Sequence, residues 1–254
     1  MYRALKKHHQ KLARIQVSHT EMRDAVLESG IDPSKVFLIP IGINLDFFPF
    51  RTPDMKTKAR VELGIPKTAF VIGSFQKDGV GWGDGLEPKL IKGPDVFVET
   101  MKRLKKNIPE LFVLLSGPAR GFVIKGLEEA QIPCQHVYLR SYPEIAKLFQ
   151  ALDLYVVASR QEGGPKAVLE SMASGVPLVT TRVGQAMDLV KHGENAFMTD
   201  VEDVDALASS ALRVYRSTPA DLQPMLDDGR RTAEANSYES QVPLWAEFMK
   251  GFVE

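Results

Sequence analysis

Two glutamates, Glu162 and Glu170, stand on either side of a glycine-rich turn in the second half of the chain. Gly163 and Gly164 supply the turn. Pro165 suits the first position of a helix because its φ angle is preset and its missing N–H is not needed there. The free N–H groups and the dipole at a helix N-terminus favour an anion. The stretch therefore predicts an anion-binding turn with a carboxylate at each end.

A buried strand must deliver this turn, and a helix must follow it. Residues 154–158 are apolar and partly β-branched, which is typical of a strand buried on both faces. Gly175 and Pro177 predict the end of the helix that begins at Pro165. Strand, turn and helix together place the two glutamates at the carboxyl end of a strand.

The same alternation of apolar strands and amphipathic helices continues from residue 59 onward. It predicts an α/β fold with a Rossmann-like doubly wound parallel sheet, because parallel strands need helical crossovers. Ligands bind at the carboxyl edge of such a sheet, where Gly73, Gly117, Arg140 and residues 181–184 also fall. The predicted strands cover residues 69–73, 111–116, 137–139, 154–158, 177–180 and 196–198, and the predicted helices cover 94–107, 122–130, 143–151, 165–174, 185–191 and 204–215.

The two ends of the chain follow a different plan, so we expect three segments, 1–50, 51–217 and 218–254. In the first, two short strands cannot form an independent sheet, which predicts a partial second α/β unit at the N-terminus. The proline-rich and aromatic stretch 47–53 is its expected linker. The N-terminal elements are a basic helix at 1–14, a strand at 15–17, a helix at 21–29 capped by Ser18 or Thr20, and a strand at 36–40. The last segment predicts helices with an apolar face formed by Trp245, Phe248, Met249 and Phe252.

Composition excludes several function classes. The 32 basic residues balance the 32 acidic ones, so no overall charge attracts nucleic acid or an anionic membrane. Cys134 is the one cysteine, which rules out an internal disulfide framework and suits a reducing compartment. The histidines are scattered and predict no metal site. No apolar run reaches the roughly 18 residues of a membrane span, so we expect a cytoplasmic location, with the cytoplasmic face of a membrane as an alternative.

Several motifs together resemble a known enzyme family. Glu162, Glu170 and the run Ser-Met-Ala-Ser-Gly-Val-Pro-Leu-Val-Thr-Thr at 171–181 are similar to the signature of the retaining GT-B glycosyltransferases of the glycosyl transferases group 1 family. Three shorter matches accompany it, namely Ile-Pro-Ile-Gly-Ile-Asn at 39–44, Lys-Gly-Pro-Asp at 92–95 and Glu-Asn-Ala at 194–196. The resemblance spans residues 18–215.

The resemblance implies a division of labour along the chain. Residues 1–50 would be the remnant of an N-terminal acceptor-side domain with the hinge, residues 51–217 the donor-binding domain, and residues 218–254 helices that cross back. The reaction would transfer a hexose from a nucleotide-diphosphate sugar to an acceptor hydroxyl with retention. It would need no metal or other cofactor. The acceptor would be a sugar, a lipid or another hydroxyl compound, and a separate acceptor-domain chain is an expected partner, whereas nucleic acid is not.

The resemblance also implies roles for individual residues. Glu162 would be catalytic, lying against the sugar ring, and Glu170 would accept hydrogen bonds from the ribose. Lys92 would contact the diphosphate, and Arg140 lies in the loop that would hold the base. Ser74 stands where the family has an arginine, so Lys77 or Lys166 would have to replace that charge. The complete predicted donor-binding set is Gly73, Ser74, Lys92, Arg140, Gly163, Gly164, Pro165, Lys166, Ala167 and Glu170.

Other interpretations stay open. Glu162 and Glu170 could be an ordinary loop carboxylate and a solvated helix residue. The whole chain could be a non-catalytic module that binds a nucleotide sugar or a partner protein, or a related sugar-nucleotide epimerase. Residues 78–85 lack the helix of a dinucleotide fingerprint and the terminal glutamate of a calcium loop. They predict either a mobile flap over the diphosphate, anchored by Trp82, or a surface loop without a role.

Overall fold

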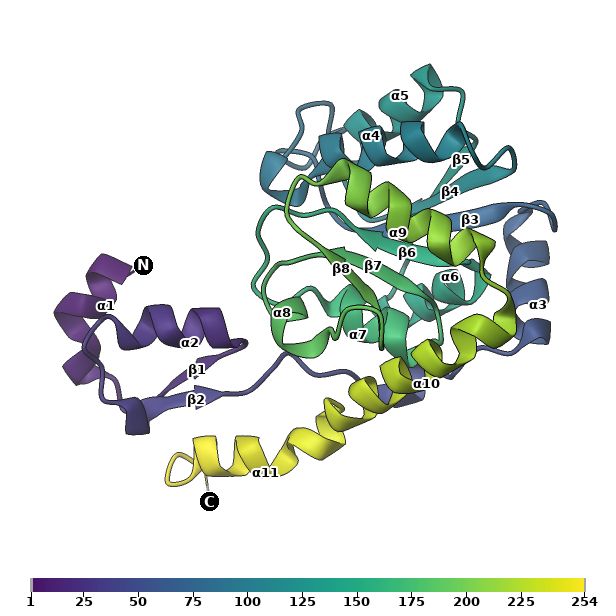
Figure 1. The fold of residues 1–254 in the computed structure, drawn as a ribbon. Helices are drawn as coiled ribbons and strands as arrows, with labels where there is room; N and C mark the ends of the chain where they lie inside the picture. Colours follow the sequence, from purple (N-terminus) through teal and green to yellow (C-terminus); the bar gives the residue numbers. More distant parts are fainter. Residues whose placement is uncertain (1, 254) are drawn as a thin grey trace.

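The computed structural model describes residues 2–253 (Figure 1), so Met1 of the predicted first helix and Glu254 of the predicted tail lie outside the described residues. A parallel six-stranded sheet has the strand order β5-β4-β3-β6-β7-β8. This order reverses between β3 and β6, as in a Rossmann-like doubly wound sheet, and it confirms the predicted fold class. The strands are β3 (Phe70–Phe75), β4 (Leu111–Ser116), β5 (Cys134–Val137), β6 (Leu154–Val157), β7 (Leu178–Thr181) and β8 (Phe197–Thr199).

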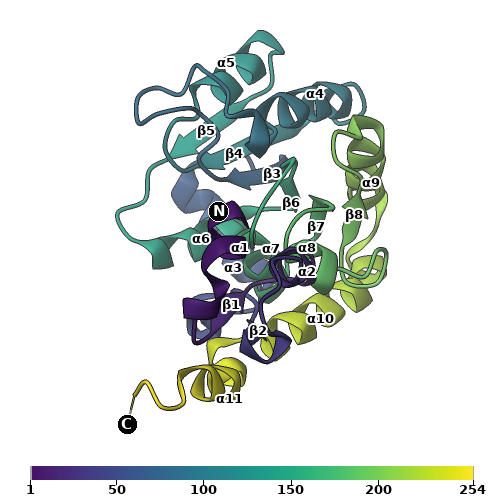
Figure 2. The ribbon, with the colours of Figure 1, turned by 90° about the vertical axis from the view of Figure 1, so that its left-hand side faces the viewer.

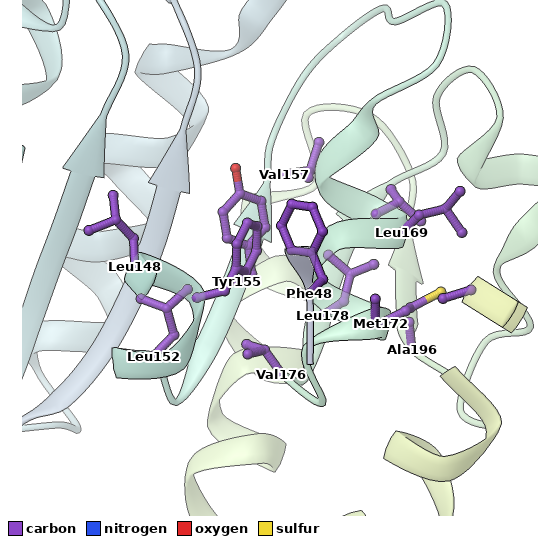
Figure 3. Packing of buried hydrophobic residues seen from close by; sticks show 14 of the residues in the cluster. Phe48, Leu148, Leu152, Tyr155, Val157, Leu169, Met172, Val176, Leu178 and Ala196 are labelled. Atoms are coloured by element: carbon purple, nitrogen blue, oxygen red, sulfur yellow. The ribbon is translucent and has the colours of Figure 1, made fainter. Parts of the chain in front are cut away.

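Helices cover both faces of this sheet (Figure 1). Side chains alternate along each strand, so that Leu114 of β4 packs in one core and its neighbours Val113 and Leu115 pack in the other. In Figure 3, Phe48 lies among Tyr155, Leu169 and Met172 in the first core. The helices of that face are α3 (Pro53–Leu63), α6 (Ile145–Ala151), α7 (Lys166–Ala173) and α8 (Ala186–Leu189), and those of the other are α4 (Pro94–Lys105), α5 (Gly121–Glu129) and α9 (Val204–Arg216).

The N-terminal elements form a small separate unit. Strands β1 (Ile15–Val17) and β2 (Val36–Leu38) pair in parallel, next to α1 (Tyr2–His8) and α2 (Thr20–Leu27). Its core consists of Val17, Val26 and Ile31, with partly buried neighbours. Neither Ser18 nor Thr20 caps α2, contrary to the prediction, because His19 occupies the N-cap position without a side-chain bond. The backbone N–H of Thr20 instead donates to Asp188 of α8 at 2.7 Å.

The C-terminal helices connect the two parts of the molecule. Helix α10 (Pro219–Ala235) packs on α7, and α11 (Tyr238–Met249) lies beneath β1 and β2 in Figure 1. Figure 2 shows the same arrangement from the side. Gln241 donates to the carbonyl of Pro40 at 3.0 Å. The predicted apolar face of the tail is only partly covered, since Phe248 packs on Phe37 while Trp245 and Phe252 stay exposed.

Some predicted bounds were wrong. Helix α3 was not predicted as an element, although Thr52 caps it, Pro53 occupies its first turn and Gly64 ends it in the left-handed conformation. Strand β5 ends at Val137, where the prediction began it at the same residue. As an edge strand, β5 takes its limits from pairing with residues 113–116 of β4, which its own half-buried side chains do not reveal. Within residues 2–253, no helix has both the length and the apolar composition needed to cross a bilayer.

Candidate functional site

The candidate site lies where β3 and β6 end, at the point where the strand order reverses. A crevice forms outside such a point because the chain leaves the two neighbouring strands in opposite directions. A cavity of about 300 Å³ opens there. Most residues predicted for the site line it, namely Lys92, Glu162, Gly164, Pro165, Lys166, Ala167 and Glu170. Because Lys92 lies 70 residues before Glu162 in the chain, the fold is what brings the two segments together.

Glu162 forms an ion pair inside this cavity. The Lys92 ammonium donates to both carboxylate oxygens of Glu162, at 2.7 and 2.6 Å. The Ser159 hydroxyl donates to Oε1 of the same carboxylate at 2.8 Å. The side chain of Lys92 is 25% exposed and that of Glu162 is 12% exposed. The pair is therefore largely withdrawn from water but still reachable from the cavity.

Glu170 has a different kind of partner. It is buried on α7, and its Oε1 accepts a hydrogen bond of 2.5 Å from the Tyr142 hydroxyl. Burial raises the pKa of Glu170 to about 6, and the bond from Tyr142 and the charge of Lys166 oppose this rise. Burial also raises the pKa of Tyr142, and the neighbouring Glu170 adds to that rise. Glu170 is thus a carboxyl group whose ionisation falls close to neutral pH.

The glycine-rich turn meets the hinge of the N-terminal unit. Pro165 is the N-cap residue of α7 and not its first helical residue, as its ψ of 104° shows. The first N–H groups of α7 have no intrahelical acceptor. They belong to Lys166 and Ala167, which line the cavity. A Cβ atom on Gly164 would lie 2.4 Å from Ile41. Gln185 accepts from the backbone N–H of Ile41 at 2.9 Å and fixes that contact.

Gly73 and Ser74 lie inside β3 and do not line the cavity. A Cβ atom on Gly73 would lie 2.4 Å from Leu152, so this position is filled by packing. Ser74 is buried, and its hydroxyl and carbonyl accept bonds from Arg120 at 3.2 and 2.7 Å. Ser74 therefore lies against a buried guanidinium, and Arg120 lines neither this cavity nor the ones beside it.

Arg120 is a residue that the sequence analysis missed. Its side chain is fully buried, and its Nε lies 3.1 Å from Asp78 Oδ1 in an ion pair. The two atoms are close but misaligned for a hydrogen bond, so the contact is mainly electrostatic. Burial lowers the pKa of Arg120 and raises that of Asp78, and each charge opposes the shift of the other. No local sequence pattern predicts that an arginine two residues after a loop proline will be buried.

The loop at residues 78–85 is fastened differently from the prediction. Trp82 is 84% exposed and does not anchor it. The Asp78–Arg120 pair holds its start, and the N–H groups of Gly121 and Phe122 donate to Asp84 and Gly85 at 2.7 and 2.8 Å. Lys77, one of the two suggested substitutes for the missing arginine, lies over the Trp82 ring at 3.6 Å. Lys166, the other, lies 5.0 Å from the Tyr142 ring and lines the cavity.

Arg140 is exposed and does not line the central cavity. Its loop contributes Tyr138 and Leu139 to an adjoining cavity of about 420 Å³, which is also lined by Phe75, Gly117 and neighbouring residues. The residue after this loop that reaches Glu170 is Tyr142. No metal position accompanies these groups, since no cluster of three or more potential ligand side chains occurs in the described part of the chain.

A larger cavity of about 850 Å³ lies on the other side of Glu162, between the N-terminal unit and the sheet. His19 and Met22 line it from one side, and Arg182 with Gly184 from the other. Gly163 faces this cavity, and Lys92 and Glu162 line both cavities. The Lys92–Glu162 pair thus stands at the boundary between them.

Comparison with known proteins gives a consistent family result. The family described as Glycosyl transferases group 1 matches residues 86–226. A UDP-Gal:alpha-D-GlcNAc-diphosphoundecaprenol alpha-1,3-galactosyltransferase of Escherichia coli is 26% identical over 211 residues, which cover 79% of this chain and 51% of that protein. A D-inositol 3-phosphate glycosyltransferase of Corynebacterium urealyticum is 26% identical over 78% of this chain and 47% of its own length. The chain spans about half the length of the curated relatives it matches.

Solved structures share the fold at low sequence identity. Anabaena Alr3699/HepE in complex with UDP and glucose superposes with a TM-score of 0.82 at 19% identity, covering 98% of this chain and 66% of that one. The C-terminal domain of a glycosyl transferase group 1 family protein (LpcC) from Francisella tularensis gives a TM-score of 0.61 at 18% identity, covering 76% of this chain and 97% of that one. Both likenesses concern the arrangement of the elements.

Proposed function

The chain belongs to the glycosyl transferases group 1 family, and from this premise we propose that it supplies the donor-binding half of a retaining hexosyltransferase. The observation that carries the proposal is the cavity at the end of β3 and β6. There, two glutamates in different environments, a lysine and the N-terminus of α7 converge. These are the groups that a nucleotide-diphosphate sugar needs, because it presents hydroxyl groups at both ends and two phosphates between them.

Each group has a proposed task. The diphosphate lies against the α7 N-terminus and Lys92, where positive charge offsets the charge that grows on the leaving group. Glu170 accepts bonds from the ribose hydroxyls, and Glu162 faces the sugar ring and the positive charge that builds at the anomeric carbon. The acceptor oxygen bonds to that carbon on the face from which the diphosphate leaves, which releases the nucleoside diphosphate and a proton. No metal takes part in this proposal.

Relatives and neighbours suggest where to begin with the donor. Alr3699/HepE was solved with UDP and with UDP-glucose, which supports a uridine diphosphate hexose as the first donor to test. The two named relatives act on acceptors of different kinds, as their names state. We propose a sugar, lipid or other hydroxyl acceptor that enters the 850 Å³ cavity beside Glu162. A cytoplasmic location, or the cytoplasmic face of a membrane, suits such a donor.

The proposal is tested by nucleotide binding. Thermal-shift screening against UDP-, GDP- and ADP-sugars identifies the base, and calorimetry with the ligand that binds then follows. Glu170→Ala should weaken the affinity by about 1.5–3 kcal/mol, because hydrogen bonds to a charged group are lost. Glu129→Ala on the exposed surface of α5 is the matched control and should change nothing. Equal affinities for the wild type and Glu170→Ala would remove Glu170 from the ribose.

A second function has one observation in its favour. Ser74 stands where the family resemblance implies an arginine, which fits a non-catalytic module that binds a nucleotide sugar and works with a separate acceptor-domain chain. Hydrolysis of UDP-glucose by this chain alone would argue against the module. Binding without turnover, followed by turnover once an acceptor-side domain is added, would support a divided enzyme.

A further inference from the structure

Lys92 and Glu162 form an ion pair, and this pairing affects which ligands the site prefers. Both oxygens of the carboxylate accept from the one ammonium, and Ser159 takes up further acceptor capacity on Oε1. A ligand phosphate that takes more than the one remaining N–H donor of Lys92 competes with Glu162. A ligand hydroxyl that binds Glu162 likewise competes with Lys92 and Ser159 for the carboxylate oxygens.

The backbone beneath the pair is built to hold it. Lys92 ends a short 3-10 helix (Leu90–Lys92), and Glu162 lies three residues beyond Ser159. The N–H groups of Arg160 and Gln161 both donate to the carbonyl of Ile91, at 2.9 and 3.2 Å. These bonds tie the two segments together directly beside the pair. The pair is therefore a fixed feature of the site and not a chance contact between two long side chains.

Breaking such a pair on one side only is costly. A largely buried carboxylate that loses its cation, and gains nothing in return, keeps an uncompensated charge. A nucleoside diphosphate brings phosphates for Lys92 but no group for Glu162. A nucleotide sugar brings phosphates for Lys92 and hydroxyl donors for Glu162, so both halves of the pair find new partners.

We propose that the Lys92–Glu162 pair is a specificity device that makes the site favour a nucleotide sugar over the corresponding nucleoside diphosphate. This inference rests on the proposed donor-binding function and adds a discrimination between substrate and product to it. Glu162 then has a second role besides facing the sugar, because its carboxylate weakens the binding of a nucleoside diphosphate that carries no sugar. The same penalty speeds release of the nucleoside diphosphate after transfer.

Calorimetry with UDP and UDP-glucose on the intact chain tests this proposal, with the GDP or ADP pair used if the screen selects that base. Glu162→Gln keeps the shape but removes the charge, so that Lys92 becomes available. UDP should then bind about tenfold more tightly than it binds the wild type, the worth of one charged hydrogen bond. UDP-glucose should bind no more tightly than before, so that the preference for the sugar form collapses.

Matched variants isolate the pair. In a Lys92→Ala background, Glu162→Gln should tighten UDP binding much less than in the wild type, because the competition for Lys92 has already been removed and only the repulsion between carboxylate and phosphates is relieved. Uridine, which has no phosphate, should bind the wild type and Glu162→Gln equally. Lys125→Ala and Glu129→Gln break an exposed pair of the same residue types on α5 and should affect none of these affinities. Circular dichroism checks the folding of each variant, and Glu162→Ala serves as a second charge-free variant.

The possible outcomes separate the two levels of the proposal. Tighter UDP binding by Glu162→Gln or Glu162→Ala, strongly reduced in the Lys92→Ala background, supports the specificity device. Unchanged or weaker UDP binding by both variants overturns it and leaves the donor-binding function standing. If the wild type binds neither nucleoside diphosphates nor nucleotide sugars, the proposed function itself fails, and the device fails with it.

Discussion

At the scale of single residues, the two glutamates of the site differ in their hydrogen-bond donors. One is bound by a lysine cation and the other by the phenol of a tyrosine. Glu162 accepts from the Lys92 ammonium, whereas Glu170 accepts from Tyr142 and is buried in α7. A neutral donor compensates a buried charge less well than a cation does, which is why burial prevails at Glu170 and raises its pKa. The same residue type thus has two different sets of partners in one cavity.

The raised pKa of Glu170 predicts a pH dependence of stability. Its pKa rises from a usual 4.5 to about 6 in the folded chain, so the folded protein holds this proton more tightly than the unfolded chain does. The contribution of Glu170 to the free energy of unfolding is therefore fully present below about pH 4.5. It is lost as the pH rises to about 6 and above, by about 2 kcal/mol in total. Glu170→Gln cannot ionise, so its free energy of unfolding should gain about that amount relative to the wild type between pH 4.5 and 7.

Urea unfolding at several pH values measures this effect. The difference between Glu170→Gln and the wild type should grow from pH 4.5 to 7 and then level off. Glu129→Gln, an exposed carboxyl on α5, should follow the wild type throughout. Parallel curves for Glu170→Gln and the wild type would show that Glu170 ionises as easily in the folded chain as in the unfolded one.

At the scale of elements, tight backbone approaches position the loops of the candidate site. Gly93 precedes α4 with a φ of 61°, and a Cβ atom there would lie 1.9 Å from the carbonyl oxygen of Ala158 at the end of β6. Gly64 ends α3 with a similar φ of 66°, but nothing lies within 4 Å of the position of its Cβ. The two glycines share the same left-handed conformation, which strains any other residue, and they differ in whether a side chain has room.

This pair of glycines allows a controlled prediction. Gly64→Ala should cost about 1–2 kcal/mol of unfolding free energy, because an alanine is strained at positive φ. Gly93→Ala should cost at least about 2 kcal/mol more, since the clash with Ala158 must also push the β6 loop away. Chemical denaturation measures both values. Equal losses would mean that the Gly93 segment moves freely and does not fix Lys92 against Glu162.

Helix α3 shows how much one element depends on distant charges. Asp153, at the start of β6, accepts from Arg60 of α3 at 2.5 Å and from the backbone N–H of Val71 at 2.7 Å. Lys56 of the same helix also pairs with Asp153. These contacts attach the helix to the sheet, and their partners lie more than eighty residues away along the chain. The 11 residues of α3 have only a weak apolar stripe, so their local pattern could not predict these contacts.

At the scale of the whole molecule, α11 ties the N-terminal unit to the rest of the chain. The Arg14 guanidinium, next to β1, donates to the carbonyls of Glu247, Phe248 and Lys250 at 3.2, 2.5 and 2.8 Å. These carbonyls belong to the end of α11, where intrahelical donors run out. Phe37 of β2 packs edge-on against Phe248 at 5.4 Å. The 850 Å³ cavity depends on this tie, because one of its walls belongs to the N-terminal unit.

Arg14→Ala should therefore loosen the N-terminal unit without unfolding the sheet. Loss of bonds from a charged donor should lower the local opening free energy of β1 and β2 by about 1–3 kcal/mol. Hydrogen exchange resolved by segment measures this loss, and amides of β4 should keep their protection. Arg3→Ala, at an exposed arginine of α1, is the control. Unchanged exchange in β1 and β2 would show that the other contacts of α11 suffice.

The sequence by itself determined the strands and helices and the edge of the sheet at which a ligand is expected. Apolar runs, helix-starting prolines and helix-ending glycines are local signals, so β4, β6, α4, α7 and α9 lie within a few residues of their predicted places. Because parallel strands need crossovers, the doubly wound sheet followed from these elements. The carboxyl edge, with the turn after Glu162 at it, followed from the sheet, whereas Lys92 was expected in the site from the family resemblance alone.

Only the tertiary structure decided which side chains meet. Lys92 and Glu162 lie 70 residues apart in the chain, Tyr142 and Glu170 lie 28 apart, and Arg120 and Ser74 lie 46 apart. No local pattern encodes such a partner, because a long charged side chain at a loop looks the same whether it enters solvent or a buried pair. The packing of strands and loops sets these distances, and burial then sets the strength of each charge. The anion turn between two glutamates was thus visible in the sequence, but the cation that already holds one of them was not.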